Sequence, residues 1–158
     1  MTAKSILFVC LGNICRSPAA DGVTRKKAEE AGLDLRIDSA GIGAWHVGQL
    51  PDPRMRQCGR KRGYDLSHRA RQVRAADFSD FDIIMGMDAQ NMADLRSLAP
   101  TDEAKGRIRL MADFLTAHKG QKSIPDPYYG DESDFDFALD LVEDAADEIV
   151  RRIRDGRL

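Results

Sequence analysis

Near its N-terminus the chain reads Ile6-Leu7-Phe8-Val9-Cys10-Leu11-Gly12-Asn13-Ile14-Cys15-Arg16-Ser17-Pro18. The four apolar residues at the start are typical of a strand that is covered on both faces. Gly12 and Asn13 tolerate a positive φ, so a tight loop is expected after the strand. Pro18 suits the first turn of a helix, where its missing N–H group costs nothing. The stretch therefore predicts a strand, a tight loop and a helix in succession.

The predicted loop combines a thiol, an anion-binding backbone and an arginine. Loop N–H groups and a helix N-terminus together bind anions. The same field favours a thiolate and lowers a cysteine pKa from about 8.5 to roughly 3.5–7.5. Arg16 is separated from Cys10 by five residues, and a guanidinium donates to two phosphate oxygens at once. We interpret Cys10 as the nucleophile of a phosphate-ester cleavage that passes through a phosphocysteine.

The spacing of Cys10 and Arg16 is common by chance when it stands alone. A bare pattern of this kind also fits a buried cysteine at a strand end near a surface arginine. The preceding apolar run, the glycine-containing loop and the helix start favour the catalytic interpretation here.

A segment far along the chain fits the same chemistry: Ile124-Pro125-Asp126-Pro127-Tyr128-Tyr129-Gly130-Asp131. By itself this segment is typical of an ordinary turn. Asp126 lies between two prolines on a stiff loop, and a positioned carboxylic acid can protonate a leaving phenolate oxygen. The two tyrosine rings offer flat walls for an aromatic substrate. Together with the cysteine loop, the segment predicts Asp126 as the general acid.

Composition and charge narrow the class of protein. Hydrophobic residues make up 42% and charged residues 32% of the 158 residues, which is ordinary for one soluble domain. A net charge of −2 argues against general nucleic-acid binding. We find no apolar run near the ~18 residues of a membrane span and no signal-peptide pattern. Three irregularly spaced cysteines indicate thiols in a reducing compartment, so we expect a cytoplasmic protein away from membranes.

Charge is distributed unevenly along the chain. Basic residues gather between Arg54 and Arg74, and acidic residues gather between Asp131 and Glu148. We interpret the two regions as solvated helix faces. The alternative is that the basic region steers anionic substrates.

Hydrophobic patterns predict alternating strands and helices. Strands are expected at residues 6–9, 35–39 and 83–85 and around 108–110. Helices are expected at 18–31, at 53–63 after Asp52, at 89–98 after Asp88, and over a long stretch from Ala138 to Ile153. This alternation indicates a parallel sheet with a ligand site at the carboxyl ends of its strands.

Five segments, in this order, carry a family resemblance: Val9 to Pro18, Asp38-Ser39-Ala40-Gly41, Trp45-His46-Val47-Gly48, Pro51-Asp52-Pro53-Arg54-Met55 and Asp126-Pro127-Tyr128-Tyr129. With them the chain resembles the low-molecular-weight protein tyrosine phosphatases over nearly its whole length. The resemblance implies one α/β domain over residues 1–158, with a four-stranded parallel sheet and helices on both faces, a fold termed phosphotyrosine phosphatase I-like. It also implies that a phosphotyrosine protein or a small aryl phosphate is hydrolysed to inorganic phosphate without metal or cofactor. We expect a monomer, although the sequence does not determine the oligomeric state.

The resemblance also assigns roles to further residues. The phosphate would be held by Leu11, Gly12, Asn13, Ile14, Cys15 and Ser17, together with Cys10 and Arg16. The substrate ring would contact Trp45, Tyr128 and Tyr129, although Trp45 could instead pack in the core. Asn13, Ser39 and His68 would form a supporting hydrogen-bond network. Without the resemblance, His68 would be interpreted as a solvent-exposed histidine. Ser17 would either cap the helix or hydrogen-bond the sulfur as the phosphocysteine breaks down, two compatible roles.

The two cysteines of the loop imply a redox expectation. We expect Cys10 to be open to solvent at the loop mouth. The family parallel makes Cys15 a resolving cysteine that forms a disulfide with Cys10 and protects it from overoxidation. The alternative is that Cys15 is a small buried thiol. Cys58, inside a predicted helix, is interpreted as a core residue.

Two other functions use a similar loop. A thiol-linked arsenate reductase shares the fold but passes electrons along further cysteines after the third strand, and residues 82–99 contain none. A phosphate-binding module would keep the anion cradle without needing Cys10 or Asp126. Turnover of a simple aryl phosphate distinguishes the binding module from the phosphatase.

Overall fold

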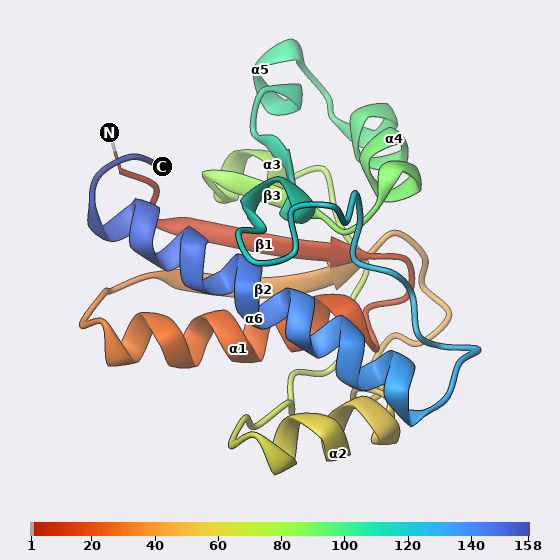
Figure 1. Cartoon of the computed structure of the whole chain (residues 1–158). Coiled ribbons are helices and arrows are strands. Elements are labelled where there is room, and N and C mark those ends of the chain that lie inside the picture. The colour runs from red at the N-terminus through yellow and green to blue at the C-terminus, as the bar shows by residue number, and fades with distance from the viewer. Residues whose placement is uncertain (1) are drawn as a thin grey trace.

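The computed structural model describes residues 2–158 and contains a four-stranded parallel sheet (Figure 1). Its strands are β1 (Ser5–Cys10), β2 (Arg36–Gly41), β3 (Ile83–Gly86) and β4 (Ile108–Leu110), in the order β2-β1-β3-β4. Every adjacent pair is parallel, and all six residues of β1 are buried. The predicted parallel sheet is confirmed, and one of its inner strands is the apolar run before the cysteine loop.

Helices cover both faces of the sheet (Figure 1). Side chains alternate along β1, so Ile6 and Phe8 belong to one apolar cluster while Leu7 and Val9 belong to another. The first cluster is completed by α1 (Arg16–Glu30), α2 (Pro53–Lys61), the 3-10 helix η1 (Met111–Phe114) and α6 (Glu132–Arg154). The second is completed by α3 (Asp77–Asp80), α4 (Ala89–Leu98) and α5 (Asp102–Lys105).

Two helices begin earlier than the sequence predicts. Helix α1 begins at Arg16 instead of Pro18. Helix α6 begins at Glu132, because Asp131 accepts from the N–H groups of Ser133 and Asp134 while Asp134 accepts from the Asp131 N–H in a capping box. The sequence does not predict α3, α5 and η1, since helices of four residues are too short to show a helical period.

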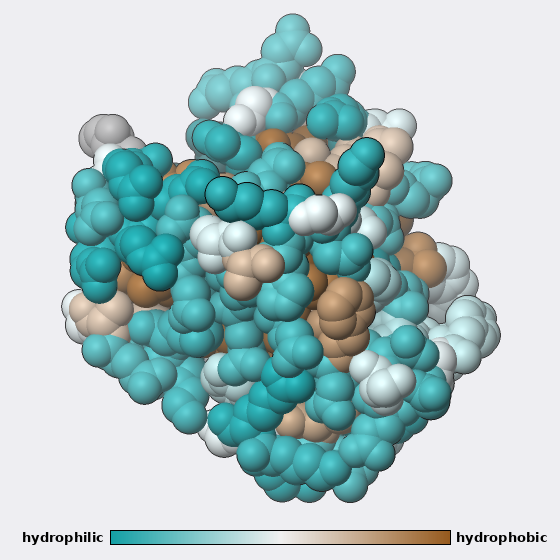
Figure 2. Space-filling model, viewed as in Figure 1, coloured by the Kyte–Doolittle hydropathy of each residue, from teal (hydrophilic) through white to brown (hydrophobic). Residues whose placement is uncertain are grey.

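The basic and acidic regions meet at the end of α2, although most of their charged side chains are exposed or partly exposed to solvent, as the sequence predicts. Arg62, just after α2, pairs with Asp136, Asp140 and Glu143 of α6. Lys61 pairs with Glu132 at 2.8 Å. Part of the basic region is therefore neutralised by α6, whose face of the molecule is mostly hydrophilic (Figure 2). Among residues 2–158, a helix with the length and apolar character of a membrane span is not found.

The carboxyl ends of three strands lie at one edge of the sheet. Cys10 at the end of β1 pairs with Gly41, and the preceding Val9 pairs with both Ala40 of β2 and Gly86 of β3. A Cβ atom at Gly41 would lie 3.0 Å from the backbone nitrogen of Asn13. Glycine at this position thus lets the loop after β1 approach the end of β2. Ligands of open parallel α/β sheets bind at this edge.

Candidate active site

A pocket of about 310 Å³ opens at the carboxyl edge of the sheet. Its lining comes from the loop between β1 and α1, from the start of α1, and from the loops around residues 45–46 and 126–129. The lining residues are Cys10, Leu11, Gly12, Ile14, Cys15, Arg16, Trp45, His46, Asp126, Tyr128 and Tyr129. The fold therefore brings the three residues predicted to be catalytic into one pocket, although Asp126 is distant in sequence.

Arg16 is 2% exposed, and its guanidinium is anchored through one nitrogen. Nη1 donates to Asp88 Oδ2 at 2.7 Å and to the carbonyl oxygen of Ile124 at 2.9 Å. Nη2 lies 3.7 Å from Asp126 Oδ2. The buried Nε has no hydrogen-bond partner among residues 2–158. The edge formed by Nε and Nη2 is thus available as a pair of donors, which is the geometry that matches an oxyanion.

The N-terminus of α1 differs from those of the other longer helices. Helices α2, α4 and α6 are capped by the side chains of Asp52, Asp88 and Asp131. Cys15, at the corresponding position of α1, makes no side-chain capping bond within the described chain. The N–H groups of the first turn stay available and carry the positive end of the helix dipole. Beside Arg16, they make this end of the pocket attractive to an anion.

Cys10 lies within the pocket and is 3% exposed, so the expectation of an open thiol at the loop mouth is wrong. Its Sγ lies 3.0 Å from Ser17 Oγ. Asn13 Nδ2 donates to Ser17 Oγ at 2.8 Å, so the single hydroxyl proton of Ser17 can go to the sulfur or to the more distant carbonyl oxygen of Ala40 at 3.5 Å. Ser17 is therefore the side chain that is placed to hydrogen-bond the Cys10 sulfur. The buried position of Ser17 beneath the loop provides this contact.

Asp126 and three aromatic rings form the outer part of the pocket. Asp126 Oδ1 accepts from the N–H of Tyr128 at 3.2 Å, while Oδ2 faces Arg16 Nη2. The rings of Tyr128 and Tyr129 meet edge to face with centroids 5.0 Å apart. Tyr129 is 96% exposed and Trp45 is 69% exposed, so both protrude at the rim. Core packing of Trp45 is therefore ruled out.

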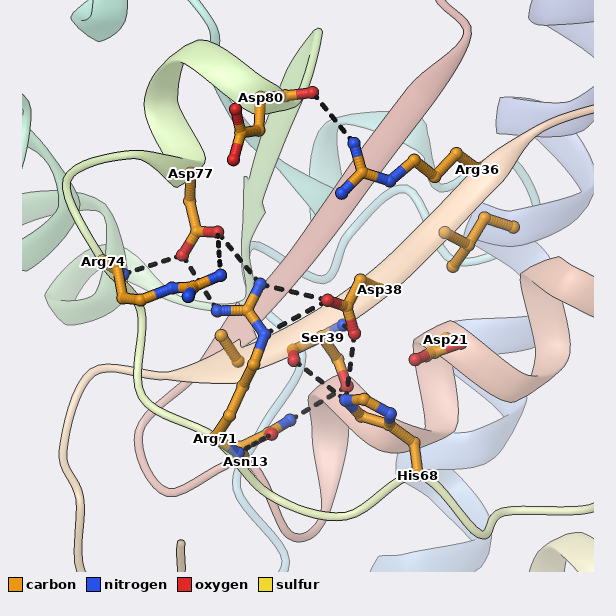
Figure 3. Close-up of polar contacts among 12 residues, drawn as sticks. Asn13, Asp21, Arg36, Asp38, Ser39, His68, Arg71, Arg74, Asp77 and Asp80 are labelled. Carbon is orange, nitrogen blue, oxygen red and sulfur yellow. Dashed lines mark hydrogen bonds and ion pairs between the residues drawn. The ribbon is translucent and has the colours of Figure 1, made fainter.

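Asn13, Ser39 and His68 lie together behind the loop (Figure 3). Asn13 Nδ2 donates to Ser39 Oγ at 3.0 Å, and His68 Nε2 lies 3.2 Å from the Ser39 carbonyl oxygen and 3.0 Å from Asp38 Oδ1. The hydrogen bond with Asp38 raises the pKa of His68 above its ordinary value of 6.5. Burial opposes ionisation of Asp38, but hydrogen bonds from His68 and the Ser39 N–H lower the pKa of Asp38 to about 2. The effect of this network on activity stays a prediction.

The three cysteines occupy different surroundings. Cys15 lines the pocket but is buried, and burial, with the nearby carboxylate of Asp52, raises the pKa of the Cys15 thiol well above its ordinary range. Cys58 is buried in the core cluster that contains α2 and α6. All three thiols are free, so a disulfide between Cys10 and Cys15 stays a prediction.

Possible metal ligands gather in two places among the described residues. Asp21, Asp38 and His68 form one cluster, and Cys58, Glu132 and Asp136 form the other. Members of the first cluster are already paired: Asp21 with Arg25 at 2.7 Å, and Asp38 with His68. Neither cluster contributes to the described lining of the pocket.

Similarity to proteins of a known family identifies the family of this chain. The model of the family described as low molecular weight phosphotyrosine protein phosphatase matches residues 5–157. The chain belongs to this family. A low molecular weight protein-tyrosine-phosphatase of Streptomyces coelicolor is 40% identical over 153 residues, covering 95% of this chain and 93% of the relative.

Two solved structures have the same fold as this low molecular weight phosphatase. A protein tyrosine phosphatase from Entamoeba histolytica, crystallised with Hepes in the active site, superposes with a TM-score of 0.93 at 42% identity, covering 98% of this chain and 99% of that chain. Vibrio vulnificus Wzb in complex with benzylphosphonate gives a TM-score of 0.83 at 31% identity, covering 94% and 98%.

Some residues of the phosphatase pocket were not predicted as site residues. His46 lines the pocket, and its ring centroid lies 6.4 Å from that of Tyr128. Asp88 was interpreted only as a helix cap, yet it also pairs with Arg16. Conversely, the predicted phosphate-binding residues Asn13 and Ser17 are not in the described lining, because their side chains are buried behind the loop. The motif Trp45-His46 was the available signal for His46; for the second role of Asp88 the sequence offers none.

Proposed function

We propose that this protein is a protein tyrosine phosphatase that hydrolyses aryl phosphate monoesters through a phosphocysteine intermediate. The observation that carries the proposal is that Cys10, the Nε–Nη2 edge of Arg16 and the carboxylate of Asp126 share one pocket. Membership of the family supports the same reaction.

In the first step, the Cys10 thiolate attacks phosphorus and the bond from phosphorus to the phenolic oxygen breaks. The Nε and Nη2 donors of Arg16 and the N–H groups at the start of α1 hold the equatorial oxygens, over which transition-state charge is spread. Asp126 gives its proton to the leaving oxygen, so a neutral phenol departs. This step leaves a phosphocysteine and an ionised Asp126.

In the second step, water attacks phosphorus and the sulfur–phosphorus bond breaks. Asp126 takes a proton from the attacking water. Ser17 Oγ, 3.0 Å from Cys10 Sγ, donates a hydrogen bond to the departing sulfur. Inorganic phosphate leaves and the thiolate is regenerated, so water is the only co-reactant that the cycle requires.

The rim of the pocket favours an aromatic leaving group. Trp45, Tyr128 and Tyr129 can flank a flat ring, and aromatic side chains contact rings edge to face or in offset stacks. The related Vibrio vulnificus Wzb structure is a complex with benzylphosphonate, in which an aromatic ring lies one carbon from a phosphonate group. We therefore infer that the substrate is a phosphotyrosine protein or a small aryl phosphate.

We further propose that residues 1–158 act as one monomeric, cytoplasmic phosphatase domain that needs neither metal nor cofactor. The proposed cycle uses only the thiolate, Arg16, Asp126 and water. The net charge of −2 gives no support for a nucleic-acid partner. Arsenate reduction is disfavoured because residues 82–99 contain no cysteine.

The proposal is tested by comparing kcat/KM for a phosphotyrosine peptide and for a phosphoserine peptide of the same sequence, in the presence of EDTA. We expect the phosphotyrosine peptide to be strongly preferred and EDTA to have no effect. Equal values would contradict the aromatic rim, and binding without turnover would support a phosphate-binding module. A pull-down with the Asp126→Ala variant, which slows turnover, would then identify the physiological substrate.

A further inference from the structure

Arg71 contacts the cysteine loop through its backbone, while its side chain contacts β2 and α3 (Figure 3). Its N–H donates to Asn13 Oδ1 at 3.0 Å, and its carbonyl oxygen accepts from the N–H of Gly41 at 2.8 Å. Its guanidinium donates to Asp38 Oδ2 at 3.1 Å and to both oxygens of Asp77 at 3.0 Å. One residue therefore joins α3, the end of β2 and the loop.

Asp77 anchors the guanidinium of Arg71. This carboxylate is 0% exposed, and a buried carboxylate requires a paired charge and hydrogen bonds. The mostly exposed Arg74 side chain lies 3.9 Å away, although the Arg74 N–H donates to Asp77 Oδ2 at 2.7 Å. Arg71 thus supplies the closer charge and the two-pronged contact. That contact fixes the side chain of Arg71, while its backbone is also held by the hydrogen bond from the Gly41 N–H.

Asn13 is the loop residue that Arg71 contacts directly. Its φ is 57°, and among the described residues it is the non-glycine residue with a positive φ. Arg71 holds Oδ1, while Nδ2 donates to Ser17 Oγ and Ser39 Oγ. Since Ser17 Oγ lies 3.0 Å from Cys10 Sγ, the buried Asp77 is linked to the sulfur by hydrogen bonds together with the covalent frames of Arg71 and Asn13.

We propose that Arg71, anchored by Asp77, is a positioning residue for the phosphatase reaction. It holds Asn13 in the left-handed conformation and thereby aims the Ser17 hydroxyl at the Cys10 sulfur. Arg71 is not among the described residues that line the pocket, so it acts through Asn13 and not on the substrate. The inference rests on the proposed function, in which Cys10 is the nucleophile.

The test uses the variant Arg71→Met/Asp77→Asn, which removes both charges of the buried pair. Asp38 also loses Arg71 but keeps its contact with His68. The melting temperature of the variant shows whether it is folded. We expect alkylation of Cys10 by iodoacetate and kcat to fall by about 10–100-fold, because small displacements in a site have effects of this size. KM should change little, since Arg16 and α1 still bind phosphate. The matched control is Arg74→Gln. The exposed Arg74 side chain lies near the same Asp77, and its loss should leave alkylation, kcat and KM unchanged.

A double-mutant cycle separates positioning from a general loss of stability. In an Asn13→Gly background, glycine adopts a positive φ without support, so removing the Arg71–Asp77 pair should slow alkylation much less than in the wild type. Equal slowing in both backgrounds, or unchanged alkylation in the folded variant, would overturn the proposal. If the double substitution unfolds the chain, Arg71→Lys replaces it. Lysine keeps a positive charge beside Asp77 but lacks the two-pronged guanidinium, and the same alkylation rates are compared in the two backgrounds. Alkylation is measured without turnover, so fast alkylation without hydrolysis would instead contradict the proposed function.

Discussion

Asp88 Oδ2 lies 2.7 Å from Arg16 Nη1, and this pair aligns the guanidinium. Asp88 is itself held in place, because its Oδ1 accepts from the N–H of Asn91 at the start of α4. One nitrogen of Arg16 is therefore committed to alignment, while the opposite edge faces the pocket. The two functions of the side chain are divided between its nitrogens.

This division predicts that Arg16→Lys is severe. An ammonium group can satisfy Asp88 or the substrate, but it cannot present two donors to an oxyanion while remaining paired with Asp88. We expect kcat/KM for p-nitrophenyl phosphate to fall by at least about 10²-fold, with losses in both kcat and KM. Asp88→Asn, which keeps an acceptor for Arg16, should lose much less. An effect of Arg16→Lys confined to KM would mean that the fork does not stabilise the transition state.

Replacement of the nucleophile is expected to separate binding from turnover. Cys10→Ser should still bind vanadate, because Arg16 and the N-terminus of α1 are unchanged, but it should not hydrolyse aryl phosphates. A serine hydroxyl at its ordinary pKa is a far weaker nucleophile than a thiolate. Cys58→Ser, in the core, is the control for substitution of a cysteine and should remain active. Residual activity of Cys10→Ser above about a tenth of wild type would be incompatible with a phosphocysteine.

Asp126→Asn tests the general acid with little structural change. Asparagine can still accept from the Tyr128 N–H, as Asp126 Oδ1 does at 3.2 Å, but it has no proton to give. We expect phosphorylation of Cys10 to slow by roughly 10²–10⁴-fold for phenols of high pKa. The deficit should shrink for phenols of low pKa, whose phenolates leave without protonation. A deficit that is constant across a series of phenols would assign Asp126 a structural role.

Local patterns predicted the layout of the fold and the main pocket residues. The apolar run at β1 and the Asp52 and Asp88 caps are local signals, so the strands and longer helices could be read from them. The pairing of Arg16 with Asp88 and the contact of Arg71 with Asn13 are different, because they join residues 72 and 58 positions apart. Such contacts depend on how the loops cross the sheet edge, which no local pattern encodes.

Stability should decline at alkaline pH because of His68. Its hydrogen bond with Asp38 raises the pKa of His68 above 6.5, so the folded state favours the protonated ring. This contribution to the free energy of unfolding is complete below about pH 6.5 and is lost as the pH rises through the raised pKa. Asp38, whose pKa is lowered to about 2 by hydrogen bonds despite burial, acts in the opposite sense and loses its contribution only as the pH falls from 3.8 toward 2.

Urea unfolding between about pH 6 and about pH 9 measures the contribution of His68. The wild type should lose stability across this range, and His68→Gln should have a flatter profile. His118→Gln, which removes the contact with Asp144 on α6, is a control for the loss of an unrelated histidine. The same decline in wild type and in His68→Gln would assign it to another group.

Oxidation is predicted to inactivate the enzyme reversibly through Cys10 and Cys15. Peroxide should convert the Cys10 thiolate to a sulfenic acid, which the Cys15 sulfur then attacks, forming a disulfide and releasing water. Both cysteines line the same pocket. Burial and the Asp52 carboxylate raise the pKa of Cys15, so the attacking thiolate is scarce at neutral pH and disulfide formation should accelerate as the pH rises.

Cys15→Ser provides the decisive comparison for this redox prediction. The variant should keep most of its activity when reduced. After peroxide, dithiothreitol should restore it less fully than the wild type, because a sulfenic acid without a resolving thiol proceeds to irreversible acids. Vanadate in the pocket should protect both proteins, since it occupies the space that peroxide must enter. Peptide mapping identifies the product: a Cys10–Cys15 disulfide supports the prediction. Cys10 found only as oxygen acids, or joined to Cys58, would remove the resolving role of Cys15 and leave the phosphatase assignment unaffected.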